Sequence, residues 1–417
     1  MNISVFIGQR LGFKTAKGGK TSPGVIIAVT GIALSLIIMM FAIAIVTGFK
    51  HEISNKLTGF NAALTIYPPE HIDETAKTDG IRLSDTITGT IQAISPGSVA
   101  TLSIRQPAIL KTDNAFQGVI LKGMPDDGNW DFINSNLIAG TLPNNADNGN
   151  DNTIVISEYT AATLGLAIGD KIKTHFFENN AIRTRNLCIT GIYNSHFNEY
   201  DRTFAFTPIG MLQQLCHVDS ITGTSIEVNG IPTANLTEQA NKLTSALLSN
   251  TLDDDSPKFY RVQTVLDACA MYYNWLDLLD TNVIVILILM ACVSGFTLIS
   301  SLFIIILERV NMIGIMKAMG ATNAQIRAIF IYMAQRLVVK GLVIGNIIGL
   351  TLLFIQQRFH TIPLDSEAYY LDFVPVEINP WYIIVLNLAV VIISSLLLIL
   401  PSHIISGMSP ARSIRYE

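Results

Sequence analysis

Long apolar runs are the strongest pattern in this chain. Three of them contain no Asp, Glu, Lys or Arg: residues 24–49, 281–307 and 381–400. Each run reaches the roughly 20 residues that a helix needs to cross the hydrocarbon core of a membrane. A fourth run, 328–355, is interrupted by Arg336 and Lys340. We therefore expect its helix to begin earlier and to hold both charges near one membrane surface. The pattern predicts four transmembrane helices.

Residues 50–280 show a different pattern, in which short alternating runs are mixed with short amphipathic ones. Residues 62–67 and 153–157 read as strands, residues 158–164 as a short helix, and residues 175–185 as a hairpin. Residues 199–202 read as a salt-bridged turn. The sequence therefore predicts a polytopic α-helical membrane protein with four transmembrane helices and a large α+β extracytoplasmic domain inserted between helices 1 and 2.

The expected organisation divides the chain into nine segments. They are a cytoplasmic amphipathic segment (1–22), transmembrane helix 1 (23–49), an extracytoplasmic α+β domain with a helical stalk (50–280), transmembrane helix 2 (281–307), a cytoplasmic helix (308–327), transmembrane helix 3 (328–355), a short extracytoplasmic loop (356–380), transmembrane helix 4 (381–401) and a cytoplasmic tail (402–417). The first apolar run is too long for a signal peptide and no A-x-A-like cleavage site follows it, so we expect a retained anchor.

Charge sets the expected orientation. Basic residues gather before the first run, between the second and third, and in the tail, whereas the loop 356–380 is acidic. By the positive-inside rule, we expect the N- and C-termini of this multi-pass protein to be cytoplasmic. Residues 50–280 hold 15 basic and 26 acidic residues, a net charge of −11. This acidity argues against nucleic acid as a partner.

A search for catalytic chemistry finds none. The seven histidines form no HExxH motif, the chain has no GxSxG, and no spacing suggests a metal site. The run Gly18-Gly19-Lys20-Thr21 lacks the first glycine of a phosphate-binding loop, because Lys14 stands at that position. The four cysteines show no CxxC spacing. We therefore expect a membrane subunit that is not an enzyme, with no metal and no cofactor on this chain.

The third run carries glycines every fourth residue, at Gly341, Gly345 and Gly349. Glycines at this spacing form a smooth ridge on one helix face, which lets another helix approach closely. We expect a helix-packing face here, with Asn346 able to form a hydrogen bond across helices. Gly295 and Ser294 in the second run are the expected partners.

A short polar stretch between the second and third runs resembles a known motif. Residues 307–309 (Leu-Glu-Arg) and 313–322 (Ile-Gly-Ile-Met-Lys-Ala-Met-Gly-Ala-Thr) resemble the "ER…IGILKAMGA" segment of ABC-transporter permeases of the FtsX/MacB type. Other short matches extend over nearly the whole chain, among them residues 6–10, 120–123, 164–170 and 413–417. Within that group the chain looks like the lipoprotein-releasing (Lol-type) permeases.

This resemblance implies a multi-pass protein of the bacterial inner membrane, in which residues 50–280 form a periplasmic domain, residues 356–380 a short periplasmic loop and residues 308–327 a cytoplasmic coupling helix. It also implies a mechanism. Such permeases pair as homo- or heterodimers and bind a separate cytoplasmic ABC ATPase, which supplies ATP and Mg. The docking site for the ATPase would be the coupling segment, formed by Glu308, Arg309, Ile313, Gly314, Lys317, Gly320, Ala321 and Thr322. ATP-driven movement would pass along the stalks to the outer domain. A lipoprotein would thereby leave the membrane lipids of the inner membrane for a periplasmic carrier.

Two alternatives remain open within the same group. A MacB-like exporter usually carries its ATPase on the same chain, which this sequence does not. An FtsX-like mechanotransmitter that regulates a cell-wall hydrolase usually has a smaller outer domain. In one member type of the Lol group a protruding hairpin binds the carrier. The matching hairpin here, 175–185, is short, so its role as a carrier site stays open.

Overall fold

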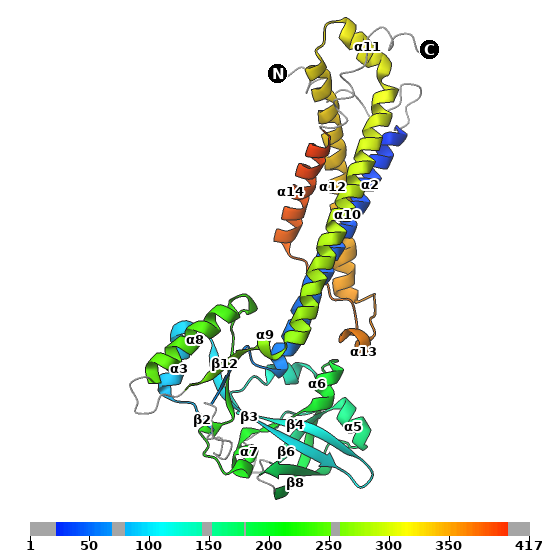
Figure 1. The fold of residues 1–417 in the computed structure, drawn as a ribbon. Coiled ribbons are helices and arrows are strands. Elements are labelled where there is room, and N and C mark those ends of the chain that lie inside the picture. Colours follow the sequence, from blue (N-terminus) through cyan, green and yellow to red (C-terminus); the bar gives the residue numbers. More distant parts are fainter. Residues whose placement is uncertain (1–21, 69–79, 144–151, 179–180, 252–258, 399–417) are drawn as a thin grey trace. The chain divides into compact units, whose positions relative to one another are not determined.

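A computed structural model describes residues 22–68, 80–143, 152–178, 181–251 and 259–398. These residues form two compact bodies (Figure 1). The helical body takes its described residues from 1–50, 276–363 and 373–417. The outer body takes its described residues from 51–275 and 364–372. The expected amphipathic segment 1–22, apart from Ser22, and the expected tail 402–417 lie outside the described residues, as does the turn Asn179-Asn180.

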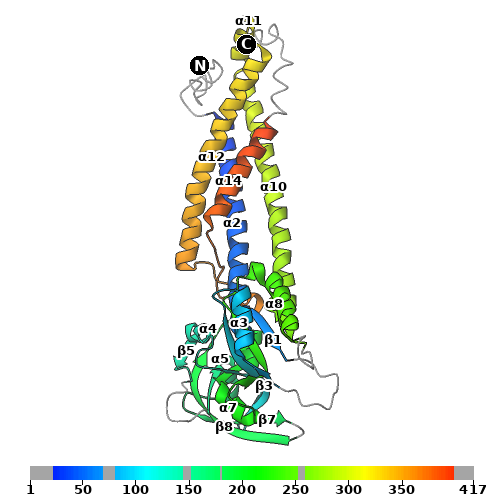
Figure 2. The same cartoon turned by 90° about the vertical axis from the view of Figure 1, so that its left-hand side faces the viewer.

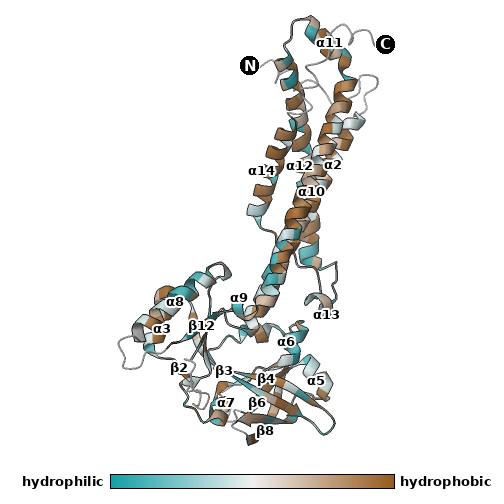
Figure 3. Cartoon of the chain, viewed as in Figure 1, coloured by the Kyte–Doolittle hydropathy of each residue, from teal (hydrophilic) through white to brown (hydrophobic). Residues whose placement is uncertain are grey.

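Long helices make up the helical body: α2 (Pro23–Phe60), α10 (Ala270–Glu308), α12 (Asn323–Phe359) and α14 (Pro380–Leu397). Within the described residues, these four are long and apolar enough to cross a membrane. Figures 1 and 2 show them running side by side, and Figure 3 shows that apolar residues cover most of their length. Ile32 and Leu36 of α2 pack in one buried cluster with Leu302 of α10 and Leu342 of α12.

Specific residues fix where these helices begin and end. Asn379 accepts a hydrogen bond from the backbone N–H of Trp381, and Pro380 occupies the first turn of α14. Helix α12 ends at Phe359, and the next residue, His360, adopts a left-handed φ of 47° that stops the helix. Helices α2 and α10 extend beyond their apolar runs into residues of the outer body.

The outer body is an α+β domain. Its strands are β1 (Leu64–Tyr67), β2 (Ile81–Arg82), β3 (Val99–Lys111), β4 (Phe116–Met124), β5 (Leu137–Gly140), β6 (Thr153–Ser157), β7 (Lys171–Glu178), β8 (Ala181–Tyr193), β9 (Phe204–Pro208), β10 (Thr222–Gly223), β11 (Ser225–Asn229) and β12 (Arg261–Thr264). Its helices are α3 (Asp85–Ile94), α4 (Asp131–Ser135), α5 (Glu158–Leu164), α6 (Asn198–Thr203), α7 (Ile209–Cys216), η1 (Thr233–Asn235), α8 (Leu236–Thr251), α9 (Val265–Ala268) and α13 (Ser366–Tyr369).

Six strands of this domain close into a ring. Following the hydrogen-bonded pairs from β3 leads through β4, β9, β6, β8 and β7 and back to β3. Alternate side chains of these strands point to one side and form a shared apolar core, which includes Leu110, Leu121, Ile156, Phe176 and Ile189. The ring is therefore a small closed barrel with its own core.

Strand β3 joins this ring to an open sheet. Its first residues pair with β11, which continues through β1 to β12, whereas its later residues pair with β4 and β7. Helix α3 packs against α8 beside the open sheet, and Ile91 and Leu243 contribute buried side chains there. Strand β3 thus forms backbone hydrogen bonds with strands of both the ring and the open sheet.

Sequence reasoning missed β3, although it is central. Pro107 lies within it and lacks the N–H that a strand interior normally donates, so the segment did not read as a strand. In the structure Pro107 pairs with Ile120 of β4, and the β7 partner begins only at Ala108.

The prediction of a salt-bridged turn at residues 199–202 is wrong. These residues form part of helix α6. The Asp201 carboxylate accepts hydrogen bonds from the hydroxyl and backbone N–H of Ser195. The Arg202 guanidinium lies over the ring of Tyr159, 4.5 Å from its centroid.

Candidate coupling helix and the contacts that support it

The segment between α10 and α12 folds into a short helix with two sharp ends. Helix α11 covers Val310–Ala318 and is preceded by Arg309, whose backbone is not helical. It ends before Gly320, which has a φ of +93°, a conformation that glycine adopts without steric cost. Thr322 and Gln325 then cap α12 by a reciprocal pair of hydrogen bonds, 3.3 and 3.0 Å long. Gly320 therefore separates α11 from α12, and the expected single helix 308–327 is divided between them.

Helix α11 has one buried side and one exposed side. Ile313 and Gly314 are buried, and Ile313 packs in the same cluster as Ile326 and Phe330 of α12. On the other side Ile315 is 56% exposed and Met319 is 75% exposed. These two side chains form a small apolar surface on the exposed side of the helix. We call the side chains of Ile315 and Met319 the α11 patch.

Some of the predicted coupling residues shape the connection between α10 and α12, and others pack against the core of the helical body. Glu308 accepts a hydrogen bond of 2.9 Å from the hydroxyl of Ser22, which joins the end of α10 to the start of α2. Ala321 packs partly buried against the helical core. Arg309 and Lys317 are partly exposed and have polar or ring contacts of their own. Sequence reasoning did not include Met319, which follows Ile315 by four residues, the spacing that brings side chains together on a helix.

The glycine ridge of α12 packs against α2. A Cβ atom added at Gly341 would lie 2.8 Å from Cβ of Ile32, and one at Gly345 would lie 2.9 Å from Cδ2 of Leu36. At Gly349 the closest atom would be the sulfur of Met40, at 3.2 Å. Gly341, Gly345 and Gly349 are therefore positions where two helices approach closely.

The expected partner of this ridge was wrong. Ser294 and Gly295 of α10 lie instead on the side of that helix that meets α14, where a Cβ on Gly295 would lie 2.5 Å from Leu397. They help to line an apolar groove of about 240 Å³ together with Leu287, Ile288, Leu386 and Ile393. The sequence pattern shows which face of a helix is smooth, but it does not show which helix covers it.

Asn346 does form a hydrogen bond across helices, and its partner is Asn387 of α14. The two side-chain amides exchange hydrogen bonds of 2.7 and 3.1 Å. Each amide also donates to the carbonyl four residues earlier, Leu342 or Ile383, at 2.8 Å. Both polar groups are thus satisfied within an apolar bundle, where an unpaired amide is costly.

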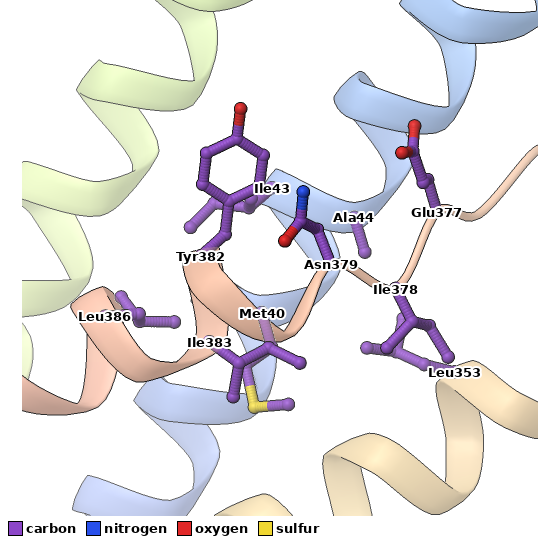
Figure 4. Close-up of a pocket in the computed structure, with 10 residues that line it drawn as sticks. All are labelled: Met40, Ile43, Ala44, Leu353, Glu377, Ile378, Asn379, Tyr382, Ile383 and Leu386. Atoms are coloured by element: carbon purple, nitrogen blue, oxygen red, sulfur yellow. The ribbon is translucent and has the colours of Figure 1, made fainter.

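The end of the bundle where α14 begins has a small open pocket with a mostly apolar lining (Figure 4). It is lined by Met40, Ile43, Ala44, Leu353, Glu377, Ile378, Asn379, Tyr382, Ile383 and Leu386. The Glu377 carboxylate points away from Ile378 and Leu353 in this view. The backbone N–H of Glu377 donates to the carbonyl of Ala44 at 3.0 Å. These contacts fix the start of α14 against α2.

In the outer body, the end of α2 is held by a buried polar network. The Lys122 ammonium donates to the backbone carbonyl of Phe60 at 2.9 Å and lies 2.8 Å from a carboxylate oxygen of Glu227. Arg105 binds the other carboxylate oxygen at 3.0 Å and the side-chain oxygen of Asn61 at 3.1 Å. A cation at the C-terminus of a helix is favourable because the helix dipole is negative there.

Charge and burial compete within this network. Burial lowers the pKa of Lys122, and the nearby Glu227 only partly restores it. For Glu227, burial acts to raise the pKa, but Lys122 and Arg105 outweigh it and leave the pKa below 4.5. Each charge thus offsets part of the cost of burying the other.

Aromatic rings complete the attachment of α2. The buried ring of Phe60 contacts Phe132 edge-on at a centroid distance of 5.0 Å and Tyr200 at 4.8 Å. Asn61 donates to the hydroxyl of Tyr200 at 3.1 Å, and that hydroxyl lies 3.3 Å from the sulfur of Cys269, just before α10. Burial raises the pKa of the Cys269 thiol. The ends of both α2 and α10 thus meet one network in the outer body.

Comparisons with known proteins cover most of the chain. Residues 25–246 match the model of the MacB-like periplasmic core domain, and residues 284–410 match that of the FtsX-like permease C-terminal region. Two relatives are the lipoprotein-releasing system transmembrane proteins LolC of Xylella fastidiosa (21% identical) and LolC of Neisseria meningitidis (22% identical). The first comparison covers 100% of this chain and 99% of the relative, and the second covers 100% of both.

A third relative and one solved structure cover parts of the chain. LolE of Haemophilus influenzae is 23% identical over 62% of this chain and 63% of its own length. The periplasmic region of MacB from Actinobacillus actinomycetemcomitans is similar over 53% of this chain and 98% of its own, with 15% identity and a TM-score of 0.34. The two family models account for both the outer domain and the helices after it, so the chain belongs to the FtsX/MacB superfamily of permeases and is similar along its whole length to lipoprotein-releasing members.

Proposed function

We propose that this chain is the permease subunit of an ATP-driven transporter that extracts lipoproteins from the bacterial inner membrane and passes them to a periplasmic carrier. The observation that carries the proposal is the full-length similarity to two LolC proteins of the lipoprotein-releasing system. The absence of catalytic motifs in the sequence agrees with it, because extraction needs force and a receiving site rather than a reaction on this chain. Each CH₂ of an acyl chain contributes about 0.8 kcal/mol to membrane anchoring, so releasing several chains needs ATP.

The α11 patch is the surface that would bind the separate ATPase. Ile315 and Met319 extend from a helix whose other side is fixed in the bundle by Ile313, so a push on this helix would be passed to α10 and α12. In this proposal α11 and both termini are cytoplasmic, the outer domain is periplasmic, and two permeases pair around the lipoprotein. ATP and Mg are bound by the ATPase.

Two experiments test this function. In the first, the gene is depleted and the positions of lipoproteins are followed: they should accumulate in the inner membrane. Correctly placed lipoproteins together with failed septal cleavage would instead support the FtsX-like alternative, and loss of drug or toxin export alone would support the MacB-like one.

The second experiment tests the docking surface. Ile315→Asp should abolish co-purification of the ATPase, because a buried unpaired carboxylate disfavours the interface. Asn323→Asp, at an exposed position in the first turn of α12, is the matched control and should retain the ATPase. Equal recovery of the ATPase with both variants would refute the assignment of the α11 patch.

A further inference from the structure

The connection between α12 and α14 is divided between the two bodies. Residues 364–372 belong to the outer body, whereas the residues directly before and after them belong to the helical body. Within this segment, α13 is followed by Tyr370, whose φ is +62°. A bulky residue rarely adopts this left-handed conformation, and it persists only where surrounding contacts hold it.

Three aromatic rings hold Tyr370. Its ring meets Phe197 at a centroid distance of 4.9 Å, Tyr272 at 5.8 Å and Trp275 at 6.4 Å. All three contacts are edge-to-face, with interplanar angles of 68°, 77° and 87°, the geometry that aromatic pairs prefer. Tyr272 and Trp275 lie in the part of α10 that belongs to the outer body.

Polar contacts fix the backbone on both sides of this ring. The ammonium of Lys56, in α2, donates to the carbonyl of Tyr370 at 3.0 Å. Two residues later, Asp372 lies 3.0 Å from Nδ1 of His196. The carbonyl of Asp372 also accepts a hydrogen bond of 2.8 Å from the N–H of Leu364, which closes the segment into a compact loop.

The residues that flank this loop are fixed in the helical body. The Gln356 side chain donates to the carbonyl of Val374 at 3.0 Å and accepts from the N–H of Ile362 at 3.1 Å. Gly48 of α2 lies so close to Pro375 that an added Cβ would be 2.8 Å from its carbonyl group. The loop is therefore attached on both sides, and few residues separate the two attachments.

We propose that Tyr370 is a positioning residue that ties the connection between α12 and α14 to the ends of α2 and α10 in the outer body. This inference rests on the proposed function, because the tie would pass movement of α12 and α14 to the outer domain during lipoprotein release. The residue contacts no cargo in this role. It acts through its contacts with Phe197, with Lys56 of α2, and with Tyr272 and Trp275 of α10.

Hydrogen–deuterium exchange of the purified full-length complex tests the tie itself. Tyr370→Ala should increase exchange in residues 364–372 and in residues 195–202, because both sides lose their shared ring contact. Tyr370→Phe keeps the ring and should exchange like the wild type. Tyr369→Ala changes a neighbouring tyrosine that is 46% exposed and should leave residues 195–202 unchanged. Unaltered exchange in Tyr370→Ala, or the same increase in Tyr369→Ala, would overturn the proposal.

Reconstituted complexes test the coupling. Lipoprotein released per ATP hydrolysed should fall about fivefold or more in Tyr370→Ala, the lower range of typical coupling between distant sites. Tyr370→Phe should restore it, and Tyr369→Ala should not change it. Full release by Tyr370→Ala, with ATP use unchanged, would refute the coupling role. If the wild-type complex hydrolyses ATP and releases no lipoprotein, the proposed function fails, and the exchange comparison alone decides whether the tie exists.

Discussion

The ammonium of Lys122 and the carboxylate of Glu227 lie 2.8 Å apart, with 2% and 4% of their side chains exposed. Such a pair contributes less to the stability of the fold than its short distance suggests, because both charges lose their hydration when they are buried. Losing one partner is much more costly than losing both. The pair therefore provides a direct test of how the end of α2 is held in the outer domain.

Lys122→Met should destabilise the outer domain strongly. It leaves Glu227 buried with only Arg105 as a charged partner and removes the donor to the Phe60 carbonyl. We expect a cost of about 3–5 kcal/mol, which lowers the melting temperature of a domain of this size by about 6–20 °C. Near-UV circular dichroism of the detergent-solubilised protein measures it.

Two further variants control this measurement. Lys122→Met combined with Glu227→Gln should recover most of the loss, because no uncompensated carboxylate remains. Lys173→Met changes an exposed lysine of β7 and should leave the melting temperature unchanged. If the double variant is as unstable as the single one, the cost does not come from the unpaired charge.

Acid should weaken the same network. The pKa of Glu227 lies below its ordinary value of 4.5 in the folded protein, because Lys122 and Arg105 outweigh the effect of burial. A carboxylate with a lowered folded-state pKa stabilises the fold above pH 4.5, and this contribution is lost as the pH falls through the folded-state pKa. The stability difference between wild type and Glu227→Gln should therefore shrink below pH 4.5.

The wild type must be compared with Glu227→Gln because Asp201 changes the pH dependence of stability in the opposite direction to Glu227. Burial raises its pKa above 3.8 in spite of its hydrogen bonds from Ser195. Its protonation therefore favours the folded state as the pH falls. Since both proteins retain Asp201, its contribution cancels in the difference of their melting temperatures. A difference that stays constant from pH 7 to pH 3 would contradict the assigned role of Glu227.

The glycine ridge should respond to side-chain size in a graded way. Gly345→Leu must displace Leu36 and the backbone of Ala33, and should cost about 1–3 kcal/mol or more and abolish lipoprotein release. Gly349→Ala should be tolerated, because its Cβ would meet the flexible end of Met40 and would lie at an ordinary contact distance of 3.6 Å from Ile37. Wild-type release by Gly345→Leu would show that this contact with α2 is not needed.

The amide pair between α12 and α14 can be measured by a double-mutant cycle. Asn346→Leu and Asn387→Leu each leave one amide without its partner, whereas the double variant removes both. We expect a coupling energy of about 0.6–1.7 kcal/mol, the range found for hydrogen bonds between membrane helices. Additive effects of the two single variants on thermal unfolding would mean that the reciprocal hydrogen bonds contribute nothing.

The sequence pattern predicted those features that repeat along one helix or strand. The four spans follow from long apolar runs. Strand β6 and helix α5 also appear at the expected residues, 153–157 and 158–164. In each case the information lies within a short stretch of chain.

Features that depend on distant residues were not predictable in this way. Lys122 appeared only as part of a short family match, because nothing near it in the sequence reveals that Glu227 and the carbonyl of Phe60 surround it. The same holds for Asn387 as the partner of Asn346, and for the loop around Tyr370. The coupling segment was predicted, but Ile315 and Met319 were not among its predicted residues, because the burial of Ile313 and the exposure of Met319 depend on how α11 packs against α12.

The strand order of the outer domain has a consequence for solubility. A strand with a free edge can pair with another molecule and start aggregation, and long flat edges are the most hazardous. Here the six-stranded ring hides most edges, and the outermost strands along the described sheet, β12 and β5, have four residues each, with a register shift in β5. A protein that must fold beside a membrane, with apolar helices still unassembled, thus presents few sites where two copies could join by mistake.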